Sequence, residues 1–326
     1  MDRRRFLSRD SAGVLLVPAE PEAPAGELTL VRVSRRAMAT RFEVALPLGT
    51  PFAVEAAEDA LDLIDDLEAQ LTVYRDDSEV SRLNAAAADG PVAVEPRLFE
   101  LLVRAAHIAR ETAGAFDAAT GAIVKAWGFF KRDGRVPSPA ERADALAKSG
   151  TRHVAFDPDA RTVKFRRRGL EFNLGGIGKG YALDRAAELL REKWGVRSAL
   201  LHGGGSSVYA IGTPPGDLRG WPVSLRHPWD DAATLGTVRL TDQGFGTSAA
   251  TFQFFEYKGE KLGHLLDPRL GWPATGTASA SAIAPTAADA DAYSTAFFVL
   301  GQEASAAFCR SRPQLTALVL PDGGQE

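Results

Sequence analysis

Apolar and polar residues alternate in two stretches near the start of the chain and follow helical spacing in the stretches after them. Alternation over residues 27–33 (ELTLVRV) and 40–46 (TRFEVAL) predicts two paired strands. Apolar residues recur every three or four positions over 52–71 and 97–113, which predicts two amphipathic helices. A further helix is predicted over 139–149, because a proline stands at its first position.

The second half of the chain consists mainly of short strand segments and is closed by helices. The expected elements are strands around 153–157 and from 162 to about 173, a helix over 177–195, strand segments from 198 to 284, a helix over 287–301, another helix, and a last strand over 315–320. Strands and helices are grouped rather than alternating along the chain. This pattern favours an α+β fold over a doubly wound parallel sheet.

Composition narrows the class of protein. The chain has 326 residues, of which 45% are hydrophobic and 25% charged, and its net charge is −4. A chain of this charge lacks the basic footprint of a nucleic-acid-binding protein, so no nucleic acid is expected as a partner. No run of about 20 apolar residues exists, so no stable membrane insertion is expected. The single cysteine, Cys309, excludes an internal disulfide and a cysteine-rich metal site.

The first 27 residues have the composition of a targeting segment. Residues 3–8 (RRRFLS) contain a twin arginine, one spacer, and then Phe-Leu, a pattern typical of an export signal. A short apolar stretch and a Pro/Ala/Glu-rich tether follow. We therefore expect residues 1–27 to be a twin-arginine-type signal and tether, residues 28–326 to be one domain, and the protein to be exported to the periplasm. If this segment is only a basic tail, the chain stays in the cytoplasm.

A glycine-rich segment, residues 173–184 (NLGGIGKGYALD), begins the helix expected over 177–195. It fails the P-loop pattern, because Gly180 rather than Ser or Thr follows the lysine, and it fails the dinucleotide pattern G-x-G-x-x-G. A glycine-rich entry into a helix nevertheless leaves backbone N–H groups free for an anion, and Lys179 would add a positive charge. The alternative is close packing of a strand against the helix, with a solvated lysine.

A second glycine motif, His202 to Gly205 (HGGG), is similar to the oxyanion-hole segment of lipases and esterases. Such enzymes carry a nucleophile elbow and place a histidine well after the serine. The nearest elbow candidate, residues 246–250 (GTSAA), lacks the final glycine, and no histidine follows His264. The sequence therefore does not support a serine hydrolase.

Two oxygen-bearing side chains on the helix expected over 287–301 can hold a metal. Asp291 and Thr295 are four residues apart and project from the same face. A carboxylate and a hydroxyl are hard donors of the kind that Mg²⁺ and Ca²⁺ prefer. The alternative is an aspartate favourable to the helix dipole and a threonine bonded to its own backbone.

Eight segments, taken together and in this order, resemble the ApbE family, the FAD:protein FMN transferases. They are 38–46 (MATRFEVAL), 71–84 (LTVYRDDSEVSRLN), 114–121 (GAFDAATG), 173–184 (NLGGIGKGYALD), 202–212 (HGGGSSVYAIG), 246–250 (GTSAA), 264–273 (HLLDPRLGWP) and 288–301 (ADADAYSTAFFVLG). The resemblance implies a single α+β domain with mostly antiparallel sheets and helices packed around a flavin cleft.

The resemblance also implies an activity. Proteins of this kind bind FAD with Mg²⁺ on its pyrophosphate, transfer FMN through a phosphoester to a Thr or Ser of an acceptor protein, and release AMP. Two alternatives use the same site: a pyrophosphatase that hydrolyses FAD to FMN and AMP, and a non-catalytic protein that only binds FAD.

Carried onto this sequence, the resemblance implies a Mg²⁺ ion held by Asp291, Thr295 and the backbone carbonyl of Gly176. The residues implied in FAD binding are Met38, Tyr74, Ala115, Phe116, Asp117, Asn173, Lys179 and His264. Three residues are expected to act in catalysis. Lys179 would bind phosphate, and either Asp291 or His264 would deprotonate the acceptor hydroxyl.

Overall fold

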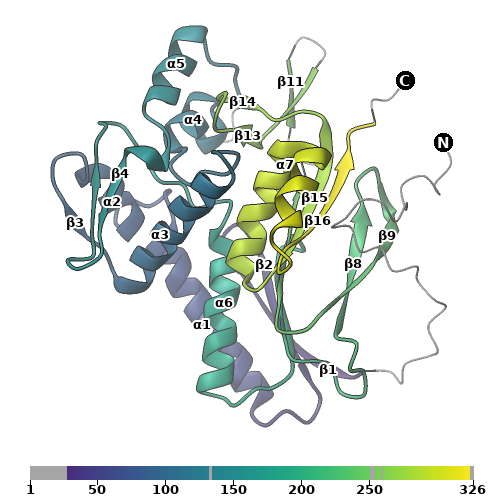
Figure 1. The fold of residues 1–326 in the computed structure, drawn as a ribbon. Helices are drawn as coiled ribbons and strands as arrows, with labels where there is room; N and C mark the ends of the chain where they lie inside the picture. The colour runs from purple at the N-terminus through teal and green to yellow at the C-terminus, as the bar shows by residue number, and fades with distance from the viewer. Residues whose placement is uncertain (1–27, 132–133, 250–253, 258–259, 324–326) are drawn as a thin grey trace.

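A seven-stranded antiparallel sheet forms the centre of the molecule (Figure 1). The computed structural model describes residues 28–131, 134–249, 254–257 and 260–323. In spatial order the strands are β1 (Leu30–Ala37), β2 (Thr40–Pro47), β6 (Ala199–Gly203), β7 (Ser207–Ile211), β10 (Gly244–Ala249), β15 (Thr277–Ala284) and β16 (Thr316–Pro321). Every neighbouring pair is antiparallel. The predicted export signal and tether, residues 1–27, lie outside the described residues.

Helices cover one face of this sheet and a hairpin covers part of the other. The helices are α1 (Ala53–Leu71), α6 (Gly178–Glu192) and α7 (Ala287–Arg310). Their apolar faces and the sheet bury one large core that includes Phe42, Phe297 and Phe298. The hairpin of β8 (Trp221–His227) and β9 (Asp230–Leu240) packs Trp221 and Leu225 onto the sheet residues Val208, Ala210 and Phe245.

A helical layer with a small second sheet lies to one side of the central sheet, and β8 and β9 lie at the opposite side (Figure 1). The elements of this helical layer and second sheet are α2 (Glu79–Ala86), β3 (Val92–Ala93), α3 (Pro96–Glu111), α4 (Gly121–Ala126), α5 (Pro139–Ala147), β4 (Val154–Asp157) and β5 (Thr162–Phe165), with short 3₁₀ turns at Phe129–Lys131 and Thr151–His153. The strands pair in the order β3-β5-β4. Two short hairpins lie between β10 and β15 along the chain: β11 (Phe254–Tyr257) with β12 (Glu260–Gly263), and β13 (Leu266–Asp267) with β14 (Trp272–Pro273). No helix in the described part of the chain is both long and apolar enough to cross a membrane.

Both hairpin turns at one end of the sheet have left-handed backbone. Met38 and Ala39 connect β1 to β2 with φ values of 48° and 60°. Positive φ at both central residues is what a two-residue type I′ turn requires, and it suits the twist of paired strands. Between β6 and β7, Gly204 and Gly205 have φ values of 66° and 71°. The HGGG motif is therefore a strand end followed by a hairpin turn.

The α+β fold and the single domain architecture of the described residues agree with the sequence-based expectation, although some elements differ. Two helices were not predicted, α2 and α4, because each spans only about two turns and shows no clear apolar period. The second strand of the pair expected after residue 153 ends at Phe165 rather than near residue 173. Gly301 interrupts the last helix with a non-helical φ of 75°, so two helical segments meet there as expected.

The first turn of α6 lies directly against the start of α7 because Gly180 has no side chain. A Cβ atom at Gly180 would lie 2.1 Å from the carbonyl oxygen of Ala287. One turn further along α6, the Asp184 carboxylate accepts hydrogen bonds from the backbone N–H groups of Ala287 (2.7 Å) and Ala288 (2.9 Å). Asp184 thus caps α7, which leaves fewer of its first N–H groups without a partner.

We expect Gly180→Ala to lower the free energy of unfolding by about 2–3 kcal/mol, since the clash is with backbone and cannot be relieved by a rotamer change. Gly178→Ala is the matched control in the same segment. Its Cβ would meet Leu174 at 3.7 Å, an ordinary contact, and alanine favours helix over glycine by up to about 1 kcal/mol. Urea unfolding of both variants checks this, and equal losses would contradict the proposed close contact.

Candidate functional site

Two helices exchange hydrogen bonds at the centre of the candidate site. The backbone N–H of Gly180, in the first turn of α6, donates to Asp291 Oδ2 at 2.8 Å. In return, Asp184 of α6 accepts the first N–H groups of α7. Each helix therefore donates backbone N–H groups to a carboxylate of the other helix. This reciprocal pair fixes Asp291 relative to the glycine segment and to Lys179.

Burial concentrates negative charge at this junction. Asp291 is only 5% exposed. Burial raises its pKa, although the charge of Lys179, the hydroxyl of Ser207 and the N–H of Gly180 oppose that rise. Burial also raises the pKa of Asp184 to about 7, and the charges of Asp289 and Asp291 add to this effect against the capping N–H groups. A cation at this place would favour the ionised carboxylates.

Hydroxyl groups from the sheet and from α7 continue the site. Thr295 Oγ1 donates to the carbonyl of Asp291 at 3.2 Å. The threonine therefore does bond to its own helix backbone, which was the alternative to a metal-binding role. The same hydroxyl lies 3.1 Å from Ser248 Oγ of β10, and Ser248 lies 3.0 Å from Ser294 Oγ. Ser207, at the start of β7, is completely buried beside Asp291 and makes no hydrogen bond of standard geometry within the described part of the chain.

The glycine segment approaches these hydroxyls at Gly176. A Cβ at Gly176 would lie 3.5 Å from Thr295 Oγ1 and 3.2 Å from the ring of Phe116. The structure therefore brings together three residues that the sequence placed on separate motifs. Asn173 helps to shape the segment, since its Oδ1 accepts the N–H of Gly175 at 3.0 Å and its own N–H donates to the carbonyl of Ala118 at 2.7 Å.

The donor atoms at this junction fit a hard divalent cation. In the described ranges, no three His, Cys, Asp or Glu side chains gather in a way that could hold a metal. A metal here would instead take one buried carboxylate, that of Asp291, with hydroxyl and carbonyl oxygens around it. Such an all-oxygen set, with positions left for substrate phosphates, suits Mg²⁺. The raised pKa of Asp291 indicates a carboxylate short of positive partners, which supports the fit.

Asp117 and Ala115 stabilise the segment that presents Phe116. The Asp117 carboxylate accepts the N–H of Ala119 (2.8 Å) and both the N–H (2.9 Å) and the hydroxyl (3.1 Å) of Thr151. Burial raises the pKa of Asp117, and these bonds oppose the rise. Ala115 is completely buried. The geometry thus gives Asp117 a turn-holding role, and it places Phe116 rather than Asp117 against Gly176.

The three remaining predicted residues come from separate segments. Met38 lies at the tip of the β1–β2 turn and packs partly on the core. Tyr74 is 65% exposed and stacks on Phe130 with ring centroids 4.9 Å apart. His264 is half-buried in the connection between β12 and β13. Within the described ranges, no hydrogen bond joins Met38 or Tyr74 to Asp291.

Comparison with known proteins identifies the family. The ApbE family model matches residues 38–319. The chain belongs to the ApbE family. Relatives include the FAD:protein FMN transferase of Treponema pallidum, 36% identical over 82% of this chain and 77% of the relative, and that of Klebsiella pneumoniae, 34% identical over 78% and 79%. The crystal structure of the ApbE protein from Thermotoga maritima matches with a TM-score of 0.82 at 28% identity, over 91% of this chain and 96% of the other.

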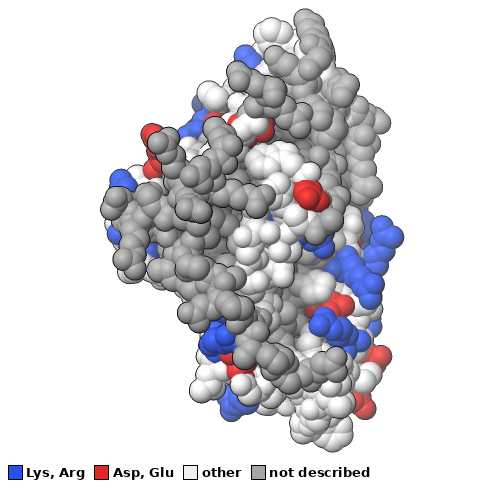
Figure 2. Space-filling view, turned by 90° about the vertical axis from the view of Figure 1, so that its right-hand side faces the viewer, with Lys and Arg blue, Asp and Glu red and all other residues white. Residues whose placement is uncertain are grey.

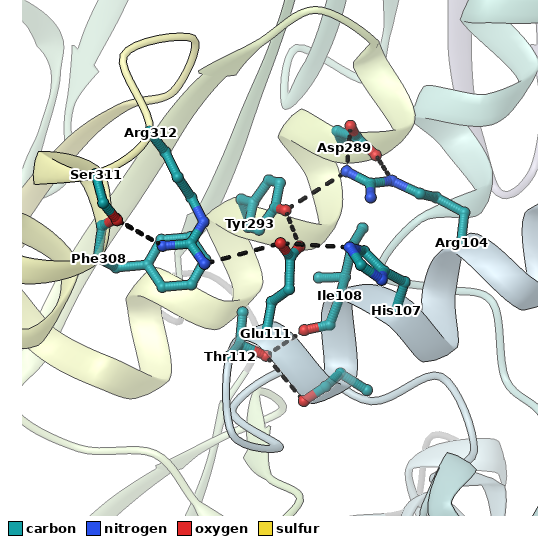
Figure 3. A network of polar contacts seen from close by, with 11 residues as sticks. Arg104, His107, Ile108, Glu111, Thr112, Asp289, Tyr293, Phe308, Ser311 and Arg312 are labelled. Carbon is teal, nitrogen blue, oxygen red and sulfur yellow. Dashed lines mark hydrogen bonds and ion pairs between the residues drawn. The ribbon is translucent and has the colours of Figure 1, made fainter.

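In this ApbE-family chain, the opposite face of α7 carries a second polar network that sequence reasoning missed. Asp289 and Tyr293 are four residues apart, and at about 100° per residue Asp291 lies roughly 200° around the helix from Asp289. Arg104 of α3 bonds both oxygens of Asp289 at 2.8 and 2.7 Å. The Tyr293 hydroxyl donates to Glu111 Oε2 at 2.7 Å (Figure 3).

The network continues around Glu111 and sets its charge. His107 Nε2 lies 3.3 Å and Arg312 Nη2 lies 3.8 Å from Glu111 Oε1. Burial tends to raise the pKa of Glu111, but the hydrogen bond from the Tyr293 hydroxyl and the charges of Arg104 and Arg312 hold it below its ordinary value. The ionised carboxylate joins α3 to Tyr293 of α7 and to Arg312, which follows the helix (Figure 3). The four-residue spacing of Asp289 and Tyr293 is visible in the sequence, whereas the residues of α3 that bond them are not.

We expect Tyr293→Phe to lower the free energy of unfolding by roughly 1.5 kcal/mol, because the hydrogen bond to a charged carboxylate is lost without removal of the ring. Tyr74→Phe is the matched control, since its hydroxyl bonds no residue that the structure describes, and it should change stability by less than about 0.5 kcal/mol. Chemical denaturation of both variants measures the difference. Identical values for the two would show that the Tyr293–Glu111 bond contributes nothing.

Proposed function

We propose that this protein transfers FMN from FAD to a Thr or Ser hydroxyl of an acceptor protein and releases AMP, with Mg²⁺ as cofactor. The observation that carries the proposal is the junction of α6 and α7, where buried Asp291, Lys179 and the glycine segment meet. The relatives named FAD:protein FMN transferase support the same reaction.

The chemistry is a substitution at phosphorus. The acceptor hydroxyl oxygen bonds to the phosphorus on the riboflavin side of the diphosphate, the bond from that phosphorus to the bridging oxygen breaks, and AMP leaves with that oxygen. Asp291, Thr295 and the Gly176 carbonyl would hold Mg²⁺, which supplies positive charge to the diphosphate when bound. Lys179 binds phosphate as a second positive charge and favours the negative charge that develops on the leaving AMP.

The remaining residues divide into binding and proton transfer. Phe116 is only 3% exposed, so its ring would support from the core the part of the glycine segment that binds FAD. Met38 and Tyr74 would be further contacts, and Asn173 keeps the glycine segment in shape. The hydroxyl proton goes to His264, because Asp291 is committed to Gly180 and the cation. An imidazole is the side chain that most often serves as a general base.

Transfer can be measured by mass spectrometry of an acceptor co-expressed with this protein, which should gain one FMN on a single threonine or serine. We expect Asp291→Asn and Lys179→Ala each to reduce the rate by at least about 100-fold, since each removes charge from the reacting diphosphate. Lys164→Ala, a change at an exposed lysine of β5, should leave it unchanged. Free FMN and AMP without a modified acceptor would instead identify a pyrophosphatase, and neither product would leave only FAD binding.

Mg²⁺ should raise the melting temperature of the wild-type protein, because a ligand that binds the folded state stabilises it by mass action. The increase should be smaller at pH 5 than at pH 7.5, since the raised pKa of Asp291 makes protons compete with the ion at the lower pH. Asp291→Asn should lose the increase at both values. A wild-type shift that Asp291→Asn retains would place the ion elsewhere.

Residues 1–27 are proposed to direct export to the periplasm on the twin-arginine pattern alone. Under this proposal the acceptor is an exported or membrane-associated protein whose modified hydroxyl faces the same compartment.

A further inference from the structure

Three exposed arginines gather at the end of the sheet where the two left-handed turns lie. Arg36 and Arg41 stand directly opposite each other on β1 and β2. Arg226, at the end of β8, has its Nη2 atom 3.8 Å from the place that a Cβ of Gly205 would take. We call these three residues the basic surface. Arg36 and Arg41 line a groove of about 370 Å³ together with Ser34, Arg35 and Thr40.

The arginines of the basic surface have no carboxylate partner among the residues that the structure describes. Arg41 bonds only the hydroxyl of Ser34, at 2.6 and 2.9 Å. Arg35, which precedes Arg36 on β1 and whose side chain turns toward α1, contrasts with this, because Asp62 and Asp65 of α1 both bind it. The same strand therefore neutralises one arginine and leaves its neighbour unpaired. On the face shown in Figure 2, Lys and Arg lie at the right-hand edge and also at the lower left, with Asp and Glu among them.

The pairing of Arg36 with Arg41 works against stability. Like charges directly opposite each other on antiparallel strands repel, whereas a carboxylate at either position would attract. A like-charge pair that destabilises the folded state, with no compensating interaction elsewhere in the structure, indicates that the two residues serve a function. Guanidinium groups bind carboxylates in a planar, two-bond geometry, so a set of unpaired arginines suits an acidic ligand.

The basic surface adjoins the candidate site through the β6–β7 turn. The N–H of Gly204 donates to the carbonyl of Arg41 at 2.9 Å, and the N–H of Thr247 donates to the carbonyl of Ser206 at 2.7 Å. The next residue, Ser207, lies beside Asp291. Arg36 and Arg41 point to the face of the sheet that carries the β8–β9 hairpin, whereas Ser207 and Asp291 lie on the helix face. From Gly205 to Ser207 the chain covers about 7 Å, so a bound segment reaches the reacting groups by continuing around the β6–β7 turn at this end of the sheet.

An exposed tryptophan identifies the ligand as protein. Trp229, at the turn between β8 and β9 and three residues after Arg226, is 49% exposed and contacts His227 edge-on. Tryptophan and arginine are the side chains most enriched among the energetically important residues of protein interfaces. A small free anion would need the arginines but no neighbouring apolar ring.

We propose that the basic surface binds an acidic segment of the acceptor protein and thereby places the acceptor hydroxyl at the junction of α6 and α7. This proposal rests on the proposed transfer function, since it concerns the second substrate of that reaction. The acidic segment is recognised by charge and the tryptophan, and FAD binds independently of it.

Binding of a labelled peptide tests the basic surface without FAD or Mg²⁺. The probe is a fluorescein-labelled peptide with one threonine flanked by aspartates, and its counterpart carries asparagines in their place. We expect the wild type to bind the aspartate peptide at least about tenfold more tightly than the asparagine peptide, with a preference that decreases as salt increases. The double variant Arg36→Glu/Arg41→Glu should lose this preference.

A matched control separates the basic surface from overall charge. Lys164→Glu makes the same change of charge per residue on β5, which lies in the three-stranded sheet at the opposite side of the molecule (Figure 1). It should bind the aspartate peptide as the wild type does. If Lys164→Glu weakens binding as much as the double variant, only net charge matters and the proposal is overturned.

Stability provides a readout that a purely structural role would not produce. Arg36→Glu alone creates an opposite-charge pair with Arg41, so its melting temperature should rise while its affinity for the aspartate peptide falls. The double variant restores a like-charge pair and should melt close to the wild type. Affinity and stability that fall together in Arg36→Glu would show that the arginines only maintain the hairpin.

Two further outcomes also overturn the proposal. One is equal binding of the two peptides by the wild type. The other is a wild type that does not bind the peptide but co-sediments with phosphatidylglycerol vesicles, while the double variant does not. That result would assign the basic surface to membrane binding. The peptide assay needs no flavin, so the two proposals can fail separately. A protein that binds the aspartate peptide but transfers no FMN would disprove the transfer function and still show that the basic surface binds acidic peptides.

Discussion

The close contact between α6 and the start of α7 is the constraint on which the candidate site depends. Gly180 allows the two backbones to touch, and the carboxylates of Asp291 and Asp184 then bond the N–H groups of the opposite helix. Neither bond could form if the helices were a side chain further apart. The glycine segment therefore serves first to bring two backbones together, and its suitability for an anion follows from that approach.

The two faces of α7 divide the work of holding this helix. One face presents Asp291 and Thr295 to the glycine segment and to β10, while the other is joined to α3 through Asp289 and Tyr293. Burial of Asp291 opposes its ionised form, so the junction favours a cation. The paired residues on the far side limit rotation of α7 about its axis, which would move the buried carboxylate out of reach of Gly180.

The sequence predicted the long helices well, since the apolar period over 52–71 extends through several turns and appears as α1. It missed α2, whose start depends on Ser78 accepting the N–H of Ser81 rather than on any repeating pattern. Asp291 and Lys179 could be named as candidates because they belong to recognisable motifs. The bond from Arg104 to Asp289 joins residues 185 positions apart, and such pairings are invisible to spacing within one element.

The reciprocal bonds at the helix junction use backbone N–H groups as one partner in every case. A backbone group is the same whatever residue carries it, so most of α6 and of the start of α7 can change side chains over evolution without altering these contacts. Only three positions cannot be replaced by another residue type without loss of these contacts: Gly180, where the helices cross, and the aspartates Asp184 and Asp291. A site built in this way can persist while the surrounding sequence diverges, and differences among relatives should accumulate on the surfaces that meet their individual acceptors.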